Sequence, residues 1–61
     1  MAGRIHWMVM RGNLEEVIEM VEDDPSVVDI TNNDGMTPLY YASYHGLVDM
    51  VTYLLDHGAD I

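Results

Sequence analysis

The sequence contains neither cysteine nor lysine among its 61 residues. Without cysteine, neither a disulfide nor a thiolate metal site can form. Arg4 and Arg11 are the two basic residues besides histidine, and they stand against eleven carboxylates, which gives a formal net charge of −9. Because proteins bind phosphate backbones through Lys and Arg, this balance predicts that the chain does not bind nucleic acid.

Long hydrophobic runs are also missing. The most apolar stretch lies within residues 5–10 and is far too short to span a bilayer. It lacks the length and the small-residue cleavage site of a signal peptide, and the negative charge disfavours anionic membrane surfaces. We therefore expect no membrane association and an intracellular location, in the cytoplasm or alternatively in the nucleus.

Four segments nevertheless carry apolar residues at helical spacing. The first runs from about residue 4 to 11 and stops at Gly12. The second covers residues 13–23, with Asn13 as its expected N-cap three residues before Glu16. Its apolar positions follow the i, i+3, i+4, i+7 pattern of one helix face: Leu14, Val17, Ile18 and Val21. These two segments are predicted to form a pair of helices.

A longer connection follows at residues 25–36. Pro25 is expected to exclude helix from its neighbours. Three β-branched residues favour an extended arm: Val27, Val28 and Ile30. The sequence "NNDG" at residues 32–35 then predicts a tight turn or short hairpin, because Asn, Asp and Gly tolerate positive φ.

The second pair of helical segments comes after this connection. Thr37 is a predicted N-cap with Pro38 in the first helical position, and this helix is expected to end at about His45, before Gly46. The fourth segment covers residues 47–57. Four apolar residues fall on one face of this segment: Val48, Val51, Leu54 and Leu55.

A shift of 34 residues superimposes the first pair on the second. The shift lays Ile5 on Leu39, Gly12 on Gly46, Val17 on Val51 and Val21 on Leu55. Self-similarity at such a period indicates a repeat protein whose units stack on one another.

Residues 32–61, "NNDGMTPLYYASYHGLVDMVTYLLDHGADI", resemble an ankyrin repeat almost from end to end. Residues 4–31 resemble a second, more degenerate copy, with Gly3-Arg4 where Thr-Pro would stand. The resemblance implies an all-α fold in which ankyrin-type helix-turn-helix repeats stack as a short solenoid, with a hairpin-like loop between the repeats. It implies one domain over residues 1–61, with repeat 1 at about 3–31 and repeat 2 at about 32–61.

Two residues depart from the family pattern. Tyr40 stands where a histidine usually follows Thr-Pro-Leu, so a phenol must find a partner there, and Met8 stands where a small alanine is usual. The resemblance further implies that several residues would leave an apolar face open after the second repeat: Val51, Leu54, Leu55 and Ile61. Either the chain is a piece of a longer array, or another molecule covers that face.

The sequence offers no convincing metal or catalytic site. His45 and His57 fall on different helices, and Pro25 occupies a ligand position in the window of residues 23–34 that has the length of a calcium loop. No nucleophile motif or glycine-rich phosphate loop is present. We expect no metal, no cofactor and no enzyme activity.

Exposed aromatic side chains are more informative. In ankyrin-like arrays, the turn tips and the inner-helix face form the usual recognition surface. Residue by residue, this surface maps onto Asn33, Asp34, Met36, Tyr41, Tyr44 and His45, and one repeat earlier onto Trp7, Met10 and Arg11. The structural alternative is that Trp7 and Tyr41 only pack on each other between adjacent inner helices.

The favoured interpretation is a protein–protein interaction module, or scaffold, that binds a protein partner through these residues. The acidic surface favours a basic partner. One alternative is a structural stacking unit of a longer array, or a self-associating fragment, with no partner of its own. Another is an acidic mimic of nucleic acid that occupies a basic protein groove.

Overall fold

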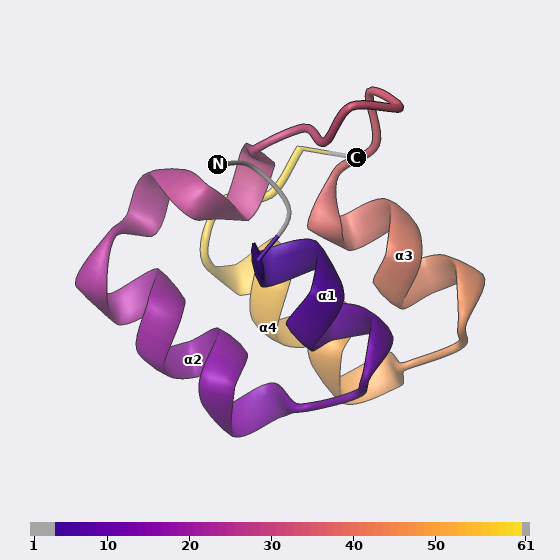
Figure 1. Ribbon diagram of the computed structural model, residues 1–61. Coiled ribbons are helices and arrows are strands. Elements are labelled where there is room, and N and C mark those ends of the chain that lie inside the picture. The colour runs from indigo at the N-terminus through magenta and orange to yellow at the C-terminus, as the bar shows by residue number, and fades with distance from the viewer. Residues whose placement is uncertain (1–3, 61) are drawn as a thin grey trace.

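The computed structural model describes residues 4–60, and this part of the chain is helical without strands. The elements are α1 (Arg4–Met10), α2 (Leu14–Asp23), a short 3-10 helix η1 (Pro25–Asp29), α3 (Pro38–Tyr44) and α4 (Val48–Asp56). Helices α1 and α2 form one helix-turn-helix pair, and α3 and α4 form the second (Figure 1). The predicted all-α class is therefore confirmed. Gly3 and Ile61 lie outside the described residues.

Local capping defines the helix ends close to where the sequence predicts them. The Asn13 side chain accepts a hydrogen bond from the Glu16 amide at 3.2 Å, and the Thr37 hydroxyl accepts one from the Tyr40 amide at 3.2 Å. After α3 the backbone turns at Gly46 with φ of 68°, a conformation that only glycine adopts without strain.

The segment after α2 corrects one prediction. Residues 25–29 form η1 instead of an extended arm, because proline fits the first turn of a helix and Asp24 caps it. The Asp24 carboxylate accepts hydrogen bonds from the Ser26 amide at 3.1 Å and from the Ser26 hydroxyl at 2.7 Å. This single turn of helix places Val28 in the core.

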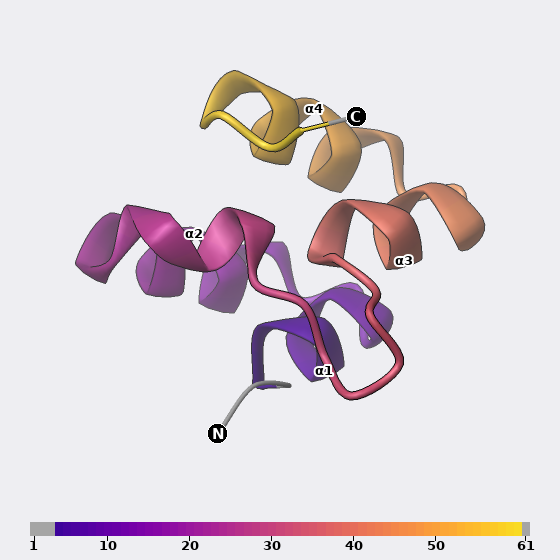
Figure 2. The ribbon, with the colours of Figure 1, turned by 90° about the horizontal axis from the view of Figure 1, so that it is seen from above.

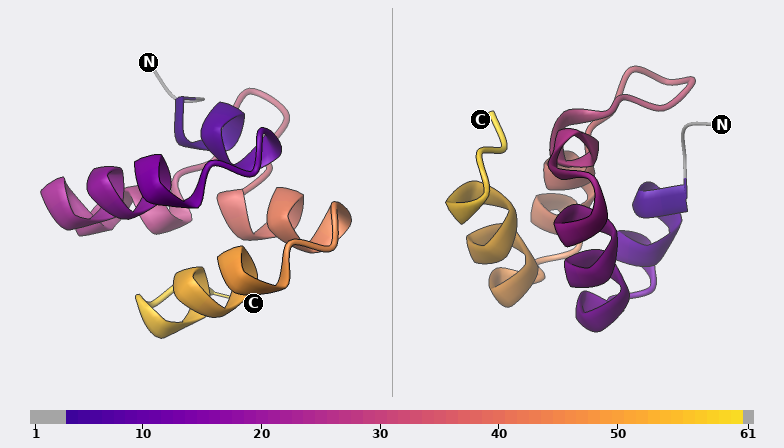
Figure 3. Two further views of the ribbon diagram at one scale, coloured as in Figure 1. Left: turned by 90° about the horizontal axis from the view of Figure 1, so that it is seen from below. Right: turned by 90° about the vertical axis from the view of Figure 1, so that its left-hand side faces the viewer.

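The loop between the two pairs is closed by Asn32. The Asn32 amide donates to the Met36 carbonyl at 3.0 Å, and the Asn32 side-chain oxygen accepts from the amides of Asp34 and Met36, both at 3.0 Å. Gly35, with φ of 78°, completes the predicted turn. The loop extends past the ends of the helices (Figures 1 and 3). It has the shape of a hairpin, but its described residues form no strand.

The two pairs stack side by side around one core. Helix α1 packs against both α2 and α3, and α3 packs against α4 and η1 (Figure 2). The core consists of Ile5, Val9, Val17, Val21, Val28, Leu39, Ala42, Met50, Leu54 and Ala59. Met8, at the position of Ala42 in the second pair, lies at the edge of this core, partly buried.

Helix α4 corrects a second prediction. Its buried residues are Met50 and Leu54, whereas Val48 is 73% exposed and Leu55 is 38% exposed. The open apolar face that the resemblance implies was therefore right for Leu55 and wrong for Leu54, which is 0% exposed. The reason is that Met50 and Leu54 belong to the core shared with the first helix pair, whereas Val48 and Leu55 lie at the surface.

His6 connects the first helix to the loop. Its imidazole is 2% exposed, and Nε2 lies 2.9 Å from the Ile30 carbonyl oxygen and 2.8 Å from the Met36 carbonyl oxygen. Since both partners are acceptors, Nε2 carries the proton and donates to both. The other ring nitrogen, Nδ1, is buried without a partner in the described chain. The sequence has Gly3, which lacks a hydroxyl, at the position equivalent to Thr37.

We predict that His6→Phe lowers the free energy of unfolding by about 2–4 kcal/mol, because two carbonyl groups lose their donor. Urea unfolding measures the change, with an osmolyte added if the variant is too unstable in buffer alone. The control is His45→Phe at an exposed position, which should stay within about 0.5 kcal/mol. Equal losses for the two variants would contradict this role of His6.

We expect the stability of the fold to depend on pH through Tyr53 on α4. Its hydroxyl is buried without a hydrogen-bond partner among residues 4–60. Burial, together with the nearby Glu22 carboxylate, raises the pKa of Tyr53 above its ordinary value of 10.0. The neutral phenol is therefore favoured in the folded state. Its contribution to stability is complete below about pH 10 and is lost as the pH rises through the folded-state pKa.

We therefore expect the stability of the parent chain to fall above about pH 10, relative to that of Tyr53→Phe. Glu22→Gln should reduce this difference, because the carboxylate repels the phenolate. Thermal unfolding of the three proteins between pH 8 and about pH 11 measures the effect. A parent chain and a Tyr53→Phe variant with parallel pH profiles would refute it.

Candidate functional site

A shallow groove lies next to the loop, on the face formed by α1 and α3, which are the inner helices of the two pairs. It has a volume of about 600 Å³. Its lining residues, which we call the aromatic groove, are Met10, Asp34, Met36, Tyr40, Tyr41, Tyr44 and His45. One comes from the end of α1, two from the loop and four from α3 and its C-cap. The groove therefore depends on how the loop is held against the two inner helices.

Aromatic rings form most of the wall. Tyr40 and Tyr44, one helical turn apart, stack with ring centroids 6.1 Å apart and an angle of 19° between their planes. The ring of His45 meets that of Tyr44 edge-on at 5.2 Å. Tyr44 is 74% exposed, so most of its surface is open to a binding partner. Stacking of this kind restricts the rings before a ligand arrives.

Tyr41 is a fixed part of the wall. Its hydroxyl accepts a hydrogen bond from the Asn32 side-chain amide at 2.8 Å, and its ring lies edge-on to His6 at 5.9 Å and to Tyr40 at 5.2 Å. Tyr41 is therefore half-buried and joined to the base of the loop. Together, Asn32 and His6 set the distance between the loop tip and α3.

The structure brings six of the nine predicted site residues into this groove and leaves three outside its lining. The six are Met10, Asp34, Met36, Tyr41, Tyr44 and His45. Of the others, Asn33 is exposed at the loop tip. Trp7 does not pair with Tyr41 as the alternative expected. It lies 54% exposed, with the Arg11 guanidinium carbon 5.9 Å from its ring centroid.

Sequence reasoning missed Tyr40, which it assigned to a structural position. Tyr40 is 45% exposed and lines the groove. The available signal was its spacing, since Tyr40, Tyr41 and Tyr44 lie within four residues of each other on a single short helix. Positions i and i+4 share a helix face, which places Tyr40 beside Tyr44.

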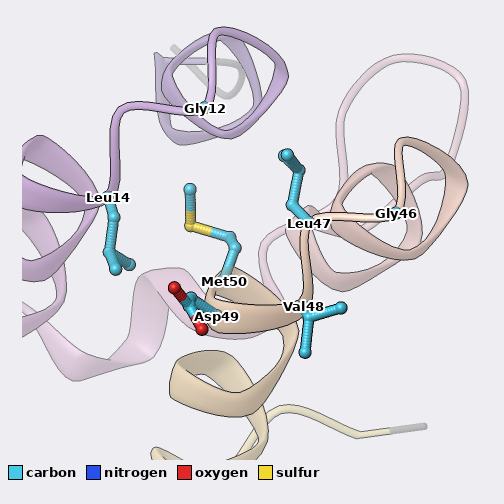
Figure 4. Close-up of a pocket in the computed structure, with 7 residues that line it drawn as sticks. All are labelled: Gly12, Leu14, Gly46, Leu47, Val48, Asp49 and Met50. Atoms are coloured by element: carbon cyan, nitrogen blue, oxygen red, sulfur yellow. The ribbon is translucent and has the colours of Figure 1, made fainter.

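A second hollow, of about 370 Å³, lies between the turn that joins α1 to α2 and the turn that joins α3 to α4 (Figure 4). In this view the Met50 side chain lies between Leu14 and Leu47, and Val48 points away from them. The remaining lining residues are Gly12, Gly46 and Asp49. One carboxylate and a small apolar surface give this hollow little with which to orient a ligand.

The carboxylates of α2 do not line the aromatic groove. Glu15, Glu19, Glu22 and Asp23 are all exposed on α2. In residues 4–60, no three histidine or carboxylate side chains are arranged to hold a metal ion. Among the helices of this region, none is long and apolar enough to cross a membrane. Asp34 is the carboxylate that lines the aromatic groove.

Comparisons with known proteins agree on one family. The family model that matches residues 4–61 is described as ankyrin repeats in three copies. Ankyrin repeat domain-containing protein 49 of Drosophila melanogaster is 39% identical over 56 residues, which are 92% of this chain and 26% of that protein. Human ankyrin repeat family A protein 2 is 32% identical over 56 residues, 92% of this chain and 18% of that protein.

A third relative is named as a protein kinase. The serine/threonine-protein kinase VIK of Arabidopsis thaliana is 39% identical over 57 residues, which are 93% of this chain but 13% of that protein. The chain thus spans between 13% and 26% of the length of these three relatives. The matched region is a repeat module and not a catalytic domain.

Proposed function

The chain belongs to the ankyrin-repeat family, and from this premise we propose that it is a protein-binding module whose aromatic groove holds a basic segment of a partner protein. Repeats of this family are generally protein-interaction modules. The observation that carries the proposal is the grouping of exposed Tyr44 with Tyr40, Met10 and Met36 in one groove. Tyr and Met are residue types enriched at protein interfaces.

Side-chain rigidity supports a binding role for this groove. Tyrosine offers a large contact area at a low cost in conformational entropy, and Tyr41 is already fixed by Asn32. Met10 and Met36 have flexible side chains that can adapt to a partner. The groove thus combines fixed rings with adaptable thioethers, as expected of a surface that recognises a peptide segment.

Charge supports a basic partner. The chain carries a net charge of −9, and Asp34 lies in the groove itself. A Lys or Arg side chain can lay its aliphatic part on the tyrosine rings and direct its charge to this carboxylate. The remaining carboxylates would speed the encounter more than they strengthen the complex. We propose that this partner is met inside the cell, in the cytoplasm or the nucleus.

The test uses peptides selected from a random displayed library against the 61-residue chain. We expect the selected peptides to carry Lys or Arg next to apolar residues. The double variant Tyr44→Ala, Met36→Ala should weaken their binding by about ten- to a hundredfold, because truncation of a central anchor costs about 2 kcal/mol or more. Isothermal titration measures the affinity, and circular dichroism checks the fold.

Two further variants make this test specific. Asp34→Asn should reduce both the association rate and its dependence on salt. Val48→Ala, at an exposed site outside the groove, should leave affinity unchanged. If the double variant binds the selected peptides as tightly as the parent chain does, the groove is not the binding site.

A further inference from the structure

We propose that the Asp34-Gly35 peptide unit at the loop tip is a site of spontaneous isoaspartate formation, and that the turn closed by Asn32 controls its rate. The modification moves the main chain of Asp34 from its α-carboxyl to its β-carboxyl group and leaves the mass unchanged. It requires water but no metal, cofactor or redox partner. This modification of the loop does not depend on whether the aromatic groove binds a peptide, so the two proposals can fail independently.

The reaction involves only atoms of this dipeptide and water. The Gly35 amide nitrogen attacks Cγ of the protonated Asp34 side chain and forms a C–N bond. The Asp34 hydroxyl group and the amide proton leave together as water, and the product is a cyclic imide. Water then adds to one carbonyl of the ring and breaks a C–N bond. When the bond to the original main-chain carbonyl breaks, the chain runs through Cβ and Cγ, and the α-carboxylate becomes free.

Glycine at the next position leaves the attacking nitrogen unhindered. Of the seven aspartates in the sequence, Asp34 is the one that glycine follows. Glycine has no Cβ beside its amide nitrogen. Apart from its chain neighbours, no heavy atom lies within 4 Å of the point where a Cβ of Gly35 would stand. Asp34 itself is exposed at the end of the loop (Figure 3). Both reacting groups are therefore open to solvent.

The other aspartates lie in settings that oppose the same ring closure. Asp24 precedes Pro25, which has no N–H. Asp29 and Asp60 are both followed by isoleucine, whose branched side chain crowds the amide nitrogen. The remaining three lie in α2 or α4, where the helical backbone fixes ψ: Asp23, Asp49 and Asp56. The structure therefore singles out Asp34.

The closed turn slows the reaction. The Gly35 amide, which contains the attacking nitrogen, donates to the Asn32 carbonyl at 2.9 Å. The amides on either side of it, those of Asp34 and Met36, donate to the Asn32 side-chain oxygen at 3.0 Å. Ring closure requires a rotation of the Asp34 main chain that these bonds oppose. The turn must open before the imide forms, so its local stability sets the rate.

Isoaspartate disturbs the contacts that hold the loop against α1. It places one more methylene in the main chain between Cα of Asp34 and the Gly35 nitrogen, so the following amides no longer align with the Asn32 oxygens. The Met36 carbonyl accepts from the Asn32 amide at 3.0 Å and from His6 Nε2 at 2.8 Å, and both bonds lie just beyond the insertion. Asp34 and Met36 also line the aromatic groove. The groove therefore changes shape when the loop is modified.

The test incubates the 61-residue chain near neutral pH. An isoaspartyl methyltransferase with radiolabelled S-adenosylmethionine counts the new α-carboxylates, and digestion with mass spectrometry assigns them. We expect the label at Asp34 without a mass change. Asn32→Ala should raise the rate by about fivefold or more, because two turn amides lose their acceptor. A peptide of residues 30–37, which has no held turn, should react faster than the parent chain.

Two further variants keep the test decisive. Asp34→Glu retains the charge but does not close the same ring, so it should carry no label at this position. Tyr41→Phe removes only the hydroxyl that the Asn32 side-chain amide contacts, and it should raise the rate less than Asn32→Ala does. Circular dichroism checks that both loop variants remain helical. The isomerised chain, separated by chromatography, should unfold at a lower urea concentration than the parent chain.

Four outcomes overturn the proposal. The first is label that falls mainly on other aspartates, or on Asn32 or Asn33 with the mass increase of deamidation. The second is a parent chain that stays unlabelled at Asp34 after the free peptide has isomerised and after Asn32→Ala has been incubated equally long. The third is a parent chain that reacts as fast as Asn32→Ala and the free peptide. The fourth is an isomerised chain with the urea midpoint of the parent.

Discussion

The two hydrogen bonds donated by His6 Nε2 hold the loop against α1, and the shape of the aromatic groove depends on them. They reach carbonyl groups 24 and 30 residues further along the chain, at Ile30 and Met36, on either side of the turn. Asn32, between these two residues, closes the turn and also donates to Tyr41 on α3. One buried imidazole thus sets the position of the loop tip relative to both inner helices.

This dependence on a few hydrogen bonds follows from the small size of the core in residues 4–60. A chain of 61 residues buries about 60% of the surface that it exposes when unfolded, so its stability is marginal. The core residues are mostly aliphatic side chains at the contacts between helices, and they cannot position a polar loop by themselves. Specific hydrogen bonds at His6 and Asn32 do so, which makes the loop a defined part of the aromatic groove.

Much of the fold is encoded locally and could be predicted from the sequence. The caps at Asn13 and Thr37 depend on residues three positions away, so their signals are visible in a short window. The helix η1 is not apparent from the sequence, because its β-branched valines favour an extended chain whereas Asp24 before Pro25 caps a helical turn. The exposure of Val48 could not be predicted from helical spacing, which shows that a face is apolar but not what covers it.

The repeat pattern predicts a recognition surface on the turn tips and inner helices, but it does not predict a groove there. Tyr44 and Met36 were identified from their positions in the repeat, and they do lie together in the groove. The roles of His6 and Asn32 were not anticipated, because their partners are distant along the chain or belong to a neighbouring helix.

Nitrogen-15 NMR of the His6 ring tests the central claim most directly. We predict an Nε2–H proton that exchanges slowly with water and shows coupling across its hydrogen bond to the carbonyl carbon of Ile30 or Met36. A ring protonated at Nδ1 alone, or an Nε2 proton in rapid exchange, would contradict the account.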